Sequence, residues 1–196
     1  MANRKNENAF TGLEAAIVLI AFVVVAAVFS YVVLGAGFFT TQKSQQVVQT
    51  SMQQASSSME VVGNVYGMAN ETSGALGYIK FTVTNTAGGS AIDISKMVVS
   101  YQDPNTRWAN LSYEGTDVPG DDVSNAQKWG INQTINNVGT PNALLEPGEQ
   151  FILVVGVENT ATPNTEFTVN LQPAIGAVFQ IKRTVPAAIN PINILY

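Results

Sequence analysis

The feature that most constrains this chain is an apolar segment near its N-terminus, LEAAIVLIAFVVVAAVFSYVVLGAGFF, which runs from Leu13 to Phe39. Glu14 is the single charged residue in it. As a helix rising about 1.5 Å per residue, the uncharged part from Ala15 to Phe39 would be about 37 Å long, enough to cross a hydrocarbon core of about 30 Å. The segment therefore predicts a helix that lies in lipid or against other apolar helices.

The composition excludes several classes of function. The chain of 196 residues contains neither histidine nor cysteine, which rules out Ser-His-Asp and Cys-His nucleophiles and metal sites built from those ligands. Only 12% of the residues are charged, the net charge is −5 and the basic residues are scattered, so a nucleic-acid surface is not expected. The composition predicts a protein that is not an enzyme and needs no cofactor.

The residues in front of the apolar segment bear on how it is used. Arg4 and Lys5 precede it, as in a signal anchor whose basic end stays in the cytoplasm. The apolar run is longer than the roughly 7–15 residues of a secretory signal, and no A-x-A site is placed sensibly after it. An uncleaved anchor, with Glu14 at the level of the lipid headgroups, is therefore one interpretation.

A second interpretation comes from a family resemblance. The residues FTGLEAAIVLIAFVVVAAVFSYVVLGAGFF from Phe10, followed by TQKSQ at 41–45, closely resemble the N-terminus of archaellins, the archaeal flagellins of the type IV pilin-like superfamily. The resemblance implies a leader peptide of residues 1–9, which a prepilin-type peptidase removes between Ala9 and Phe10, so that Glu14 becomes the fifth residue. Such a cut would place a new α-amino group about one helical turn from the Glu14 carboxylate, where an ion pair could offset the cost of burying it.

The exact cut stays open. In this superfamily the residue before the cut is usually glycine, and basic residues are frequent there, whereas this chain has Ala9 with Glu7 and Asn8 in front of it. A cut between Gly12 and Leu13 satisfies the glycine preference but leaves glutamate at the second position. Phe10 is therefore the favoured start.

The helix is predicted to continue beyond the apolar segment to Val62, giving a helix of residues 10–62. Residues 40–60 contain neither Gly nor Pro, and apolar residues recur there at heptad-like spacings. Gly63 is predicted to end the helix, and residues 63–70 are predicted to form a linker. The predicted polymerisation core, in which copies of the helix pack together, comprises Ile17, Leu19, Ile20, Phe22, Val24, Val28, Val32, Gly35, Gly37, Val48, Met52, Ala55 and Met59.

Residues 71–196 show the alternation of β-strands, with Gly, Pro, Asn and Asp at the turns. The segment 151–157 is apolar on both faces and predicts a central strand, while Pro147-Gly148-Glu149 predicts a structural reverse turn in front of it. The fold class is therefore α+β: a long N-terminal helix followed by an antiparallel β-sandwich, which the resemblance implies to be immunoglobulin-like.

Two kinds of candidate site lie in the outer domain. N-glycosylation sequons occur at Asn70, Asn110 and Asn132, a number that chance alone predicts in so Asn-rich a chain. Asp117, Asp121 and Asp122 form an acidic group that predicts a solvated loop, with a structural Ca²⁺ or Mg²⁺ site as the alternative.

The leading hypothesis is a structural subunit of the archaeal motility filament, the archaellum, which is an extracellular homopolymer assembled from membrane-inserted precursors. The resemblance implies as partners other copies of the chain, related minor subunits, the peptidase, a membrane platform and a secretion-type ATPase. An archaeal type IV adhesion pilin is the first alternative. The second is a membrane-anchored extracellular binding module.

Overall fold

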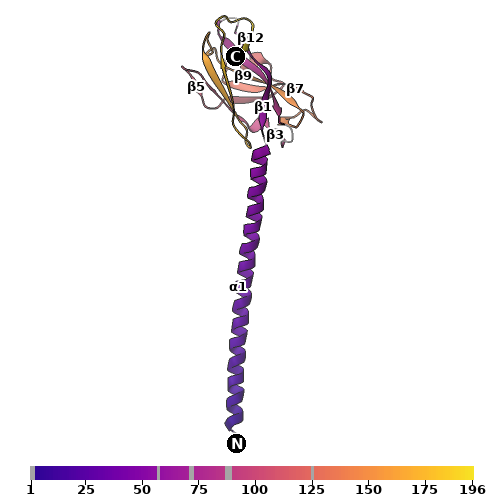
Figure 1. The fold of residues 1–196 in the computed structure, drawn as a ribbon, viewed down its shortest axis with the longest axis vertical. Helices are drawn as coiled ribbons and strands as arrows, with labels where there is room; N and C mark the ends of the chain where they lie inside the picture. Colours follow the sequence, from indigo (N-terminus) through magenta and orange to yellow (C-terminus); the bar gives the residue numbers. More distant parts are fainter. Residues whose placement is uncertain (1–2, 57, 71–72, 87–89, 125) are drawn as a thin grey trace. The chain divides into compact units, whose positions relative to one another are not determined.

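The structure of the chain is a computed structural model that describes residues 3–56, 58–70, 73–86, 90–124 and 126–196. The chain divides into two compact units, 1–50 and 51–196. The first unit is helical and the second carries all the described strands (Figure 1). A long N-terminal apolar helix followed by an antiparallel-rich β domain confirms the predicted α+β class.

The helix α1, Asn3–Ser56, has 54 residues. It is the one helix among the described residues that is long and apolar enough to cross a membrane. An apolar surrounding offers no water to backbone groups, and a helix satisfies them within itself even where β-branched residues are frequent. Where the apolar segment ends, the Thr40 hydroxyl donates to the Ala36 carbonyl at 2.8 Å and the Thr41 hydroxyl to that of Gly37 at 3.1 Å. The first polar side chains therefore need no outside partner.

The prediction that the helix continues to Val62 is wrong, and so is the linker at 63–70. The helix ends at Ser56, and the strand β1, Met59–Ala69, occupies both ranges. Serine competes for backbone hydrogen bonds outside helices, and the Ser58 carbonyl already accepts from the Thr86 N–H at 3.0 Å. Gly63 interrupts regular structure, but in a strand and not at the end of a helix. Its φ of +79° coincides with an irregularity in the pairing of β1.

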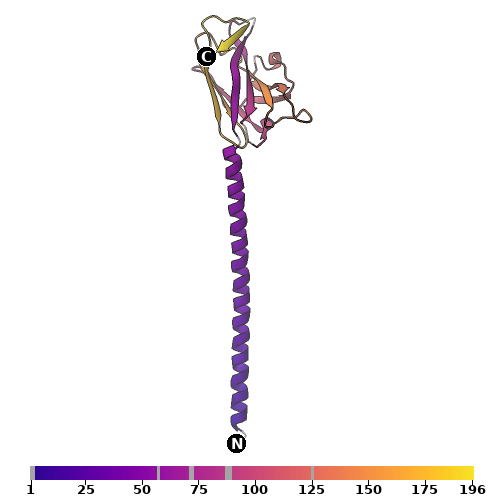
Figure 2. The ribbon, with the colours of Figure 1, turned by 45° about the vertical axis from the view of Figure 1, so that its right-hand side comes forward.

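The described strands form three sheets. The order is β12-β1-β2-β9-β7-β6 in a six-stranded sheet, β11-β10-β4-β5 in a four-stranded sheet, and β3-β8 in a small two-stranded sheet. Figure 2 shows β12 beside β1, the pair that joins the two ends of the domain's sequence. The remaining elements are β2 Leu76–Asn85, β3 Ile92–Asp93, the 3₁₀ turn η1 Ile94–Lys96, β4 Val98–Gln102, β5 Arg107–Trp108, β6 Ser112–Thr116, α2 Gly120–Val123, β7 Lys128–Ile135, β8 Leu144–Leu145, β9 Gln150–Gly156, β10 Glu166–Gln172, β11 Phe179–Thr184 and β12 Ile192–Leu195.

The inward faces of the two larger sheets share one apolar core. Its largest fully buried side chains are Trp129 on β7, Phe81 on β2, Phe151 on β9, Tyr101 on β4 and Phe167 on β10. The central strand predicted at 151–157 is confirmed as β9, which lies between β2 and β7. The described strands pair antiparallel except for β6 with β7, which is parallel, and an isolated parallel bridge joins Asn85 to Pro147. An antiparallel-rich sandwich is thus present, while its immunoglobulin-like character stays a prediction.

Tyr101 is a buried phenol with a carboxylate partner. Its hydroxyl donates to Asp103 Oδ2 at 3.1 Å and accepts from the Thr160 hydroxyl at 3.2 Å, and its ring stacks on Phe167 with centroids 6.0 Å apart. Burial, reinforced by the Asp103 charge, raises the pKa of the Tyr101 phenol well above its ordinary value.

This shift predicts alkaline destabilisation of the outer domain. Because the folded pKa of Tyr101 lies above the unfolded one, the folded state holds the proton more tightly, and its stability falls as pH rises above about 10. Urea unfolding at pH 8 and pH 11 is expected to give a lower midpoint at pH 11. In Tyr101→Phe, that difference between the two pH values is expected to shrink. An undiminished difference would assign the effect to other groups.

Candidate assembly surface and processing site

The part of α1 from Ala15 to Phe39 is apolar on all sides and uncovered in the single chain. Every described side chain from Gly12 to Gln54 is exposed. Gly35 and Gly37 have no neighbouring atom within 4 Å of where a Cβ would stand, so other backbones can approach closely there. The predicted core positions that lie on this exposed surface are Ile17, Leu19, Ile20, Phe22, Val24, Val28, Val32, Gly35, Gly37, Val48 and Met52.

Two predicted core positions differ from the rest. Met59 is wrong as a helix-packing residue, because it begins β1 and is only 5% exposed within the core of the β domain. The seven-residue spacing between Met52 and Met59 does not reflect helix packing, because α1 ends at Ser56 and Met59 belongs to β1. Ala55 belongs to α1, but its side chain lies outside the described residues.

The predicted processing positions all lie within α1. Ala9, Phe10, Gly12 and Leu13 have helical backbone, and the Glu14 side chain is exposed. Neither cut is distinguished by a break in the helix, so the choice between them stays a prediction.

The turn predicted at Pro147-Gly148-Glu149 is confirmed. It also contains a buried carboxylate that accepts backbone hydrogen bonds. Gly148 has a φ of +92°, and the Glu149 N–H donates to the Glu146 carbonyl at 3.1 Å. The Glu149 side chain is 1% exposed, and its carboxylate accepts from the backbone N–H groups of Val138 and, at 3.0 Å, Glu146. A buried carboxylate thereby ties the 136–143 loop to the start of β9.

The three sequons stand in different surroundings. The Asn70 amide donates to Asn159 Oδ1 at 2.9 Å, and the Asn132 amide donates to the Val118 carbonyl at 2.9 Å. Asn110 lies in the loop between β5 and β6 and is exposed. Because a glycan is attached through the amide nitrogen, Asn110 is the most accessible acceptor of the three.

The acidic residues do not come together as a metal site. Asp117 is exposed in the loop after β6 with a φ of 58°, whereas Asp121 and Asp122 lie in the first turn of α2. Among the described residues, no group of three or more carboxylate side chains is arranged to hold a metal ion. The arrangement instead fits the solvated loop.

A further surface was missed by the sequence. Tyr66 and Met68 on β1 lie opposite Ile194 and Ile192 on β12, all on the outward side of the six-stranded sheet, and Tyr78 on β2 lies opposite Met68. We call these five residues the β1–β12 face. The alternation in INIL at 192–195 was the signal that could have found it, but β12 had not been predicted.

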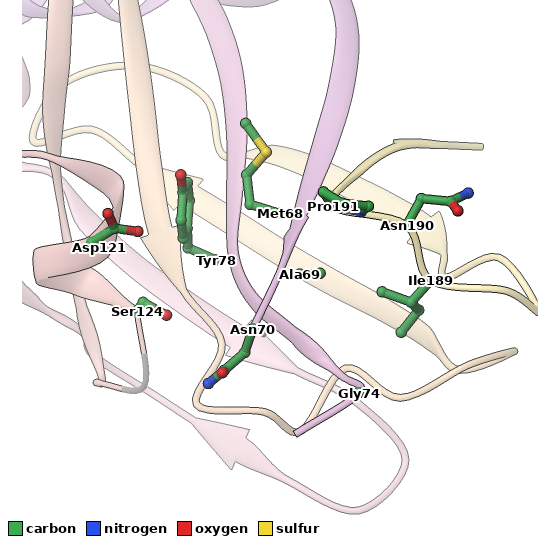
Figure 3. Close-up of a pocket in the computed structure, with 10 residues that line it drawn as sticks. All are labelled: Met68, Ala69, Asn70, Gly74, Tyr78, Asp121, Ser124, Ile189, Asn190 and Pro191. Atoms are coloured by element: carbon green, nitrogen blue, oxygen red, sulfur yellow. The ribbon is translucent and has the colours of Figure 1, made fainter. Parts of the chain in front are cut away.

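The β1–β12 face leads into a groove of about 710 Å³ (Figure 3). Met68 and Tyr78 lie between its two walls, with Asp121 and Ser124 on the α2 side and Ile189, Asn190 and Pro191 on the other. The described residues that line the groove form no catalytic constellation.

Comparison with known proteins agrees with the helix and the outer domain. A family model described as archaeal-type flagellin matches residues 9–183. "Probable flagellin 1" of Archaeoglobus fulgidus is 40% identical over 198 residues, covering 97% of this chain and 96% of its own length. The chain belongs to the archaeal-type flagellins.

Solved structures extend this assignment. A subunit of the archaeal flagellum of Methanospirillum hungatei matches with a TM-score of 0.73 and 32% identity over 94% of this chain and 99% of its own. Archaeal flagellin FlaB1 from Methanocaldococcus jannaschii, at 17% identity and a TM-score of 0.61, shares the fold over 71% of this chain.

This archaellin is therefore a structural subunit of a motility filament and not an enzyme. It self-assembles into a homopolymer outside the cell, and its N-terminal apolar helix is consistent with membrane insertion of the precursor. Of the three hypotheses, the membership favours the motility filament over the adhesion pilin and the anchored binding module.

Proposed function

We propose that α1 serves this archaellin twice, first as the membrane anchor of the precursor and then as the core of the filament. The observation that carries the proposal is its uncovered apolar surface, which the described part of the chain leaves exposed on all sides. Lipid or other copies of the helix can cover such a surface. Assembly then exchanges lipid contacts for helix contacts at little cost in apolar burial, with the small residues allowing close backbone approach.

Removal of residues 1–9 before Phe10 is the step that commits the helix to the filament. Arg4 and Lys5 favour the cytoplasmic side of the membrane, and a charged leader carried into an apolar helix bundle would be costly. After the cut, the α-amino group at Phe10 lies about one turn from Glu14, near enough to pair with its carboxylate.

The assembly partners follow from the same resemblance. A prepilin-type peptidase makes the cut, a membrane platform receives the trimmed subunit, and a secretion-type ATPase supplies the energy, for which this chain has no P-loop. Related minor subunits join the same polymer. If glycans are attached to the exposed filament, Asn110 carries the first of them, because its amide is the most accessible.

Mass spectrometry of filaments sheared from cells tests both proposals. The expected N-terminal peptide begins at Phe10, and a peptide containing Asn110 is expected to carry added mass that Asn110→Gln abolishes. A start at Leu13 would move the cut to the alternative site. Subunits that retain Met1 in the filament would contradict the trimming step, and glycan on Asn132 but not on Asn110 would contradict the accessibility argument.

A further inference from the structure

The exchange of lipid contacts for helix contacts around α1 is nearly neutral for apolar side chains, because lipid chains and apolar side chains offer similar surroundings. A side chain that fares differently in lipid and in a helix bundle therefore influences which of the two is favoured. Between Ala15 and Phe39, only Ser30 and Tyr31 carry polar side-chain atoms. Their two hydroxyls are the candidates for such a difference.

A short hydroxyl can be satisfied by its own helix. The Thr40 hydroxyl does so, since it donates to the Ala36 carbonyl four residues earlier at 2.8 Å, and a serine can do the same. The hydroxyl of a tyrosine stands at the far end of a rigid ring and does not reach the backbone of its own helix. Tyr31 is 80% exposed, so the described part of the chain covers neither its ring nor its hydroxyl. The Tyr31 hydroxyl therefore needs a partner from outside the chain.

Tyr31 also lies too deep in the apolar segment to anchor it at the lipid headgroups. It is four residues beyond Ala27, the middle of the uncharged part, which places its backbone about 6 Å from the centre of a bilayer that this part spans. The hydrocarbon core extends about 15 Å to either side. Helical side chains lean towards the N-terminus, which directs the Tyr31 ring towards the bilayer centre and away from the nearer surface. In lipid the hydroxyl therefore finds no water, unlike that of an interfacial tyrosine.

A neighbouring copy of α1 can supply the missing acceptor. A carbonyl oxygen in a helix keeps a second lone pair after it has accepted its intrahelical hydrogen bond. That lone pair is accessible where the surrounding side chains are small enough for another helix to approach closely. At Gly35 and Gly37, no neighbouring atom lies within 4 Å of where a Cβ would stand. The carbonyls of residues 35–37 are thus open to a phenol from the next helix.

The homopolymer supplies both groups at every contact. Each copy brings the same helix, so a Tyr31 hydroxyl and an open 35–37 segment are present on every neighbour. Neighbours in a helical polymer meet through two different surfaces, so a donor on one copy and an acceptor on the next are compatible with the assembly. The pair is continuous with the apolar helix surface that the filament core covers.

We propose that the Tyr31 hydroxyl donates a hydrogen bond to a main-chain carbonyl of residues 35–37 on a neighbouring α1 in the filament. The proposal rests on the filament-core function given above and names a residue that biases the exchange. In lipid the hydroxyl is unpaired, at a cost in free energy, and in the filament it is paired. Tyr31 therefore favours the assembled state over the membrane-inserted one, which the apolar side chains around it do not.

The test compares Tyr31→Phe with Thr40→Val in filaments sheared from cells. Tyr31→Phe removes the hydroxyl and keeps the ring. Thr40→Val, the matched control, removes a hydroxyl that is bonded within its own helix. At a fixed detergent concentration, where micelles take the place of the membrane, the concentration of unsedimented subunit is measured. It is expected to rise about threefold in Tyr31→Phe, the effect of an average interhelical hydrogen bond, and to stay at the wild-type value in Thr40→Val.

Cryo-electron microscopy of wild-type filaments locates the acceptor. The Tyr31 oxygen is expected about 2.7–3.0 Å from a carbonyl oxygen of residues 35–37 in a neighbouring copy. A hydroxyl without an acceptor on a neighbouring helix, or one bonded elsewhere than residues 35–37, would contradict the proposed pair.

An unchanged unsedimented concentration in Tyr31→Phe would overturn the proposal, as would an equal rise in Thr40→Val. Both results would leave the filament function in place, because wild-type subunits still sediment as filaments. Wild-type subunits that do not sediment, or filaments whose core is not built from α1, would count against the filament-core function itself.

Discussion

Replacing Val24 by aspartate is expected to abolish sedimentable filaments while leaving the precursor in the membrane. Val24 lies in the middle of the apolar part of α1 and is exposed in the single chain. In lipid, one aspartate at the helix centre costs about 2.5–3.5 kcal/mol on the insertion scale, which the rest of this strongly apolar helix offsets. In a filament core the same carboxylate has no partner and meets its own copies, and the cost is several kcal/mol per ion. The penalty recurs at every subunit, so polymerisation fails.

The measurement is the amount of subunit in the membrane fraction and in the sheared, sedimentable fraction. Val24→Leu, which keeps the apolar surface, is the control and is expected to give near-normal filaments. Filaments formed at wild-type yield by Val24→Asp would mean that α1 does not pack as the filament core at this position.

Replacing Glu149 by alanine is expected to have the largest effect of any single change in the outer domain away from the aromatic core. The buried carboxylate accepts the backbone N–H groups of Val138 and Glu146. Alanine removes both acceptors and leaves two donors unpaired, at about 1–3 kcal/mol for each that stays buried. Glutamine is expected to be intermediate, because its oxygen can accept one N–H while its NH₂ group faces the other donor.

Urea unfolding of the detergent-solubilised subunit, followed by the fluorescence of buried Trp129, measures this effect. Glu166→Ala is the matched control, since Glu166 pairs with Lys182 at 2.9 Å on the surface and such exposed pairs contribute about 0–1 kcal/mol. Equal unfolding midpoints for Glu149→Ala and Glu166→Ala would show that the buried carboxylate does not hold the loop.

Local patterns in the sequence were enough for the existence of the helix, the class of the outer domain and the exclusion of His- and Cys-based catalysis. An apolar run with one charge can be stable only as a helix in lipid or against other apolar helices. The absence of His and Cys excludes the nucleophiles and metal sites that require those residues. The alternation of apolar and polar residues over 71–196 predicted β-strands there, because the sandwich buries one face of strands such as β2, β10 and β11. The resemblance at the N-terminus then pointed to the family.

Non-local contacts decided the rest. The heptad-like pattern predicted a helix that extends beyond Ser56, where α1 ends. The helix ends there because the following residues form β1, which pairs with β2 and β12, segments about 20 and 130 residues away in the sequence. The same pairing buried Met59 and set Tyr66 beside Ile194. Glu149 looked like an ordinary turn residue until the fold enclosed its carboxylate.

The sequence by itself determined that this chain has an apolar helix in need of cover and a β domain held by its core without disulfides. Composition and periodicity act over a few residues, and they suffice where burial is all-round or strictly alternating. The tertiary structure alone decided where the helix ends and the first strand begins. It also decided which sequon asparagine has an accessible amide and which sheet face is exposed to solvent. Those features depend on which segments that are distant in the sequence contact one another, and a local sequence pattern does not determine such contacts.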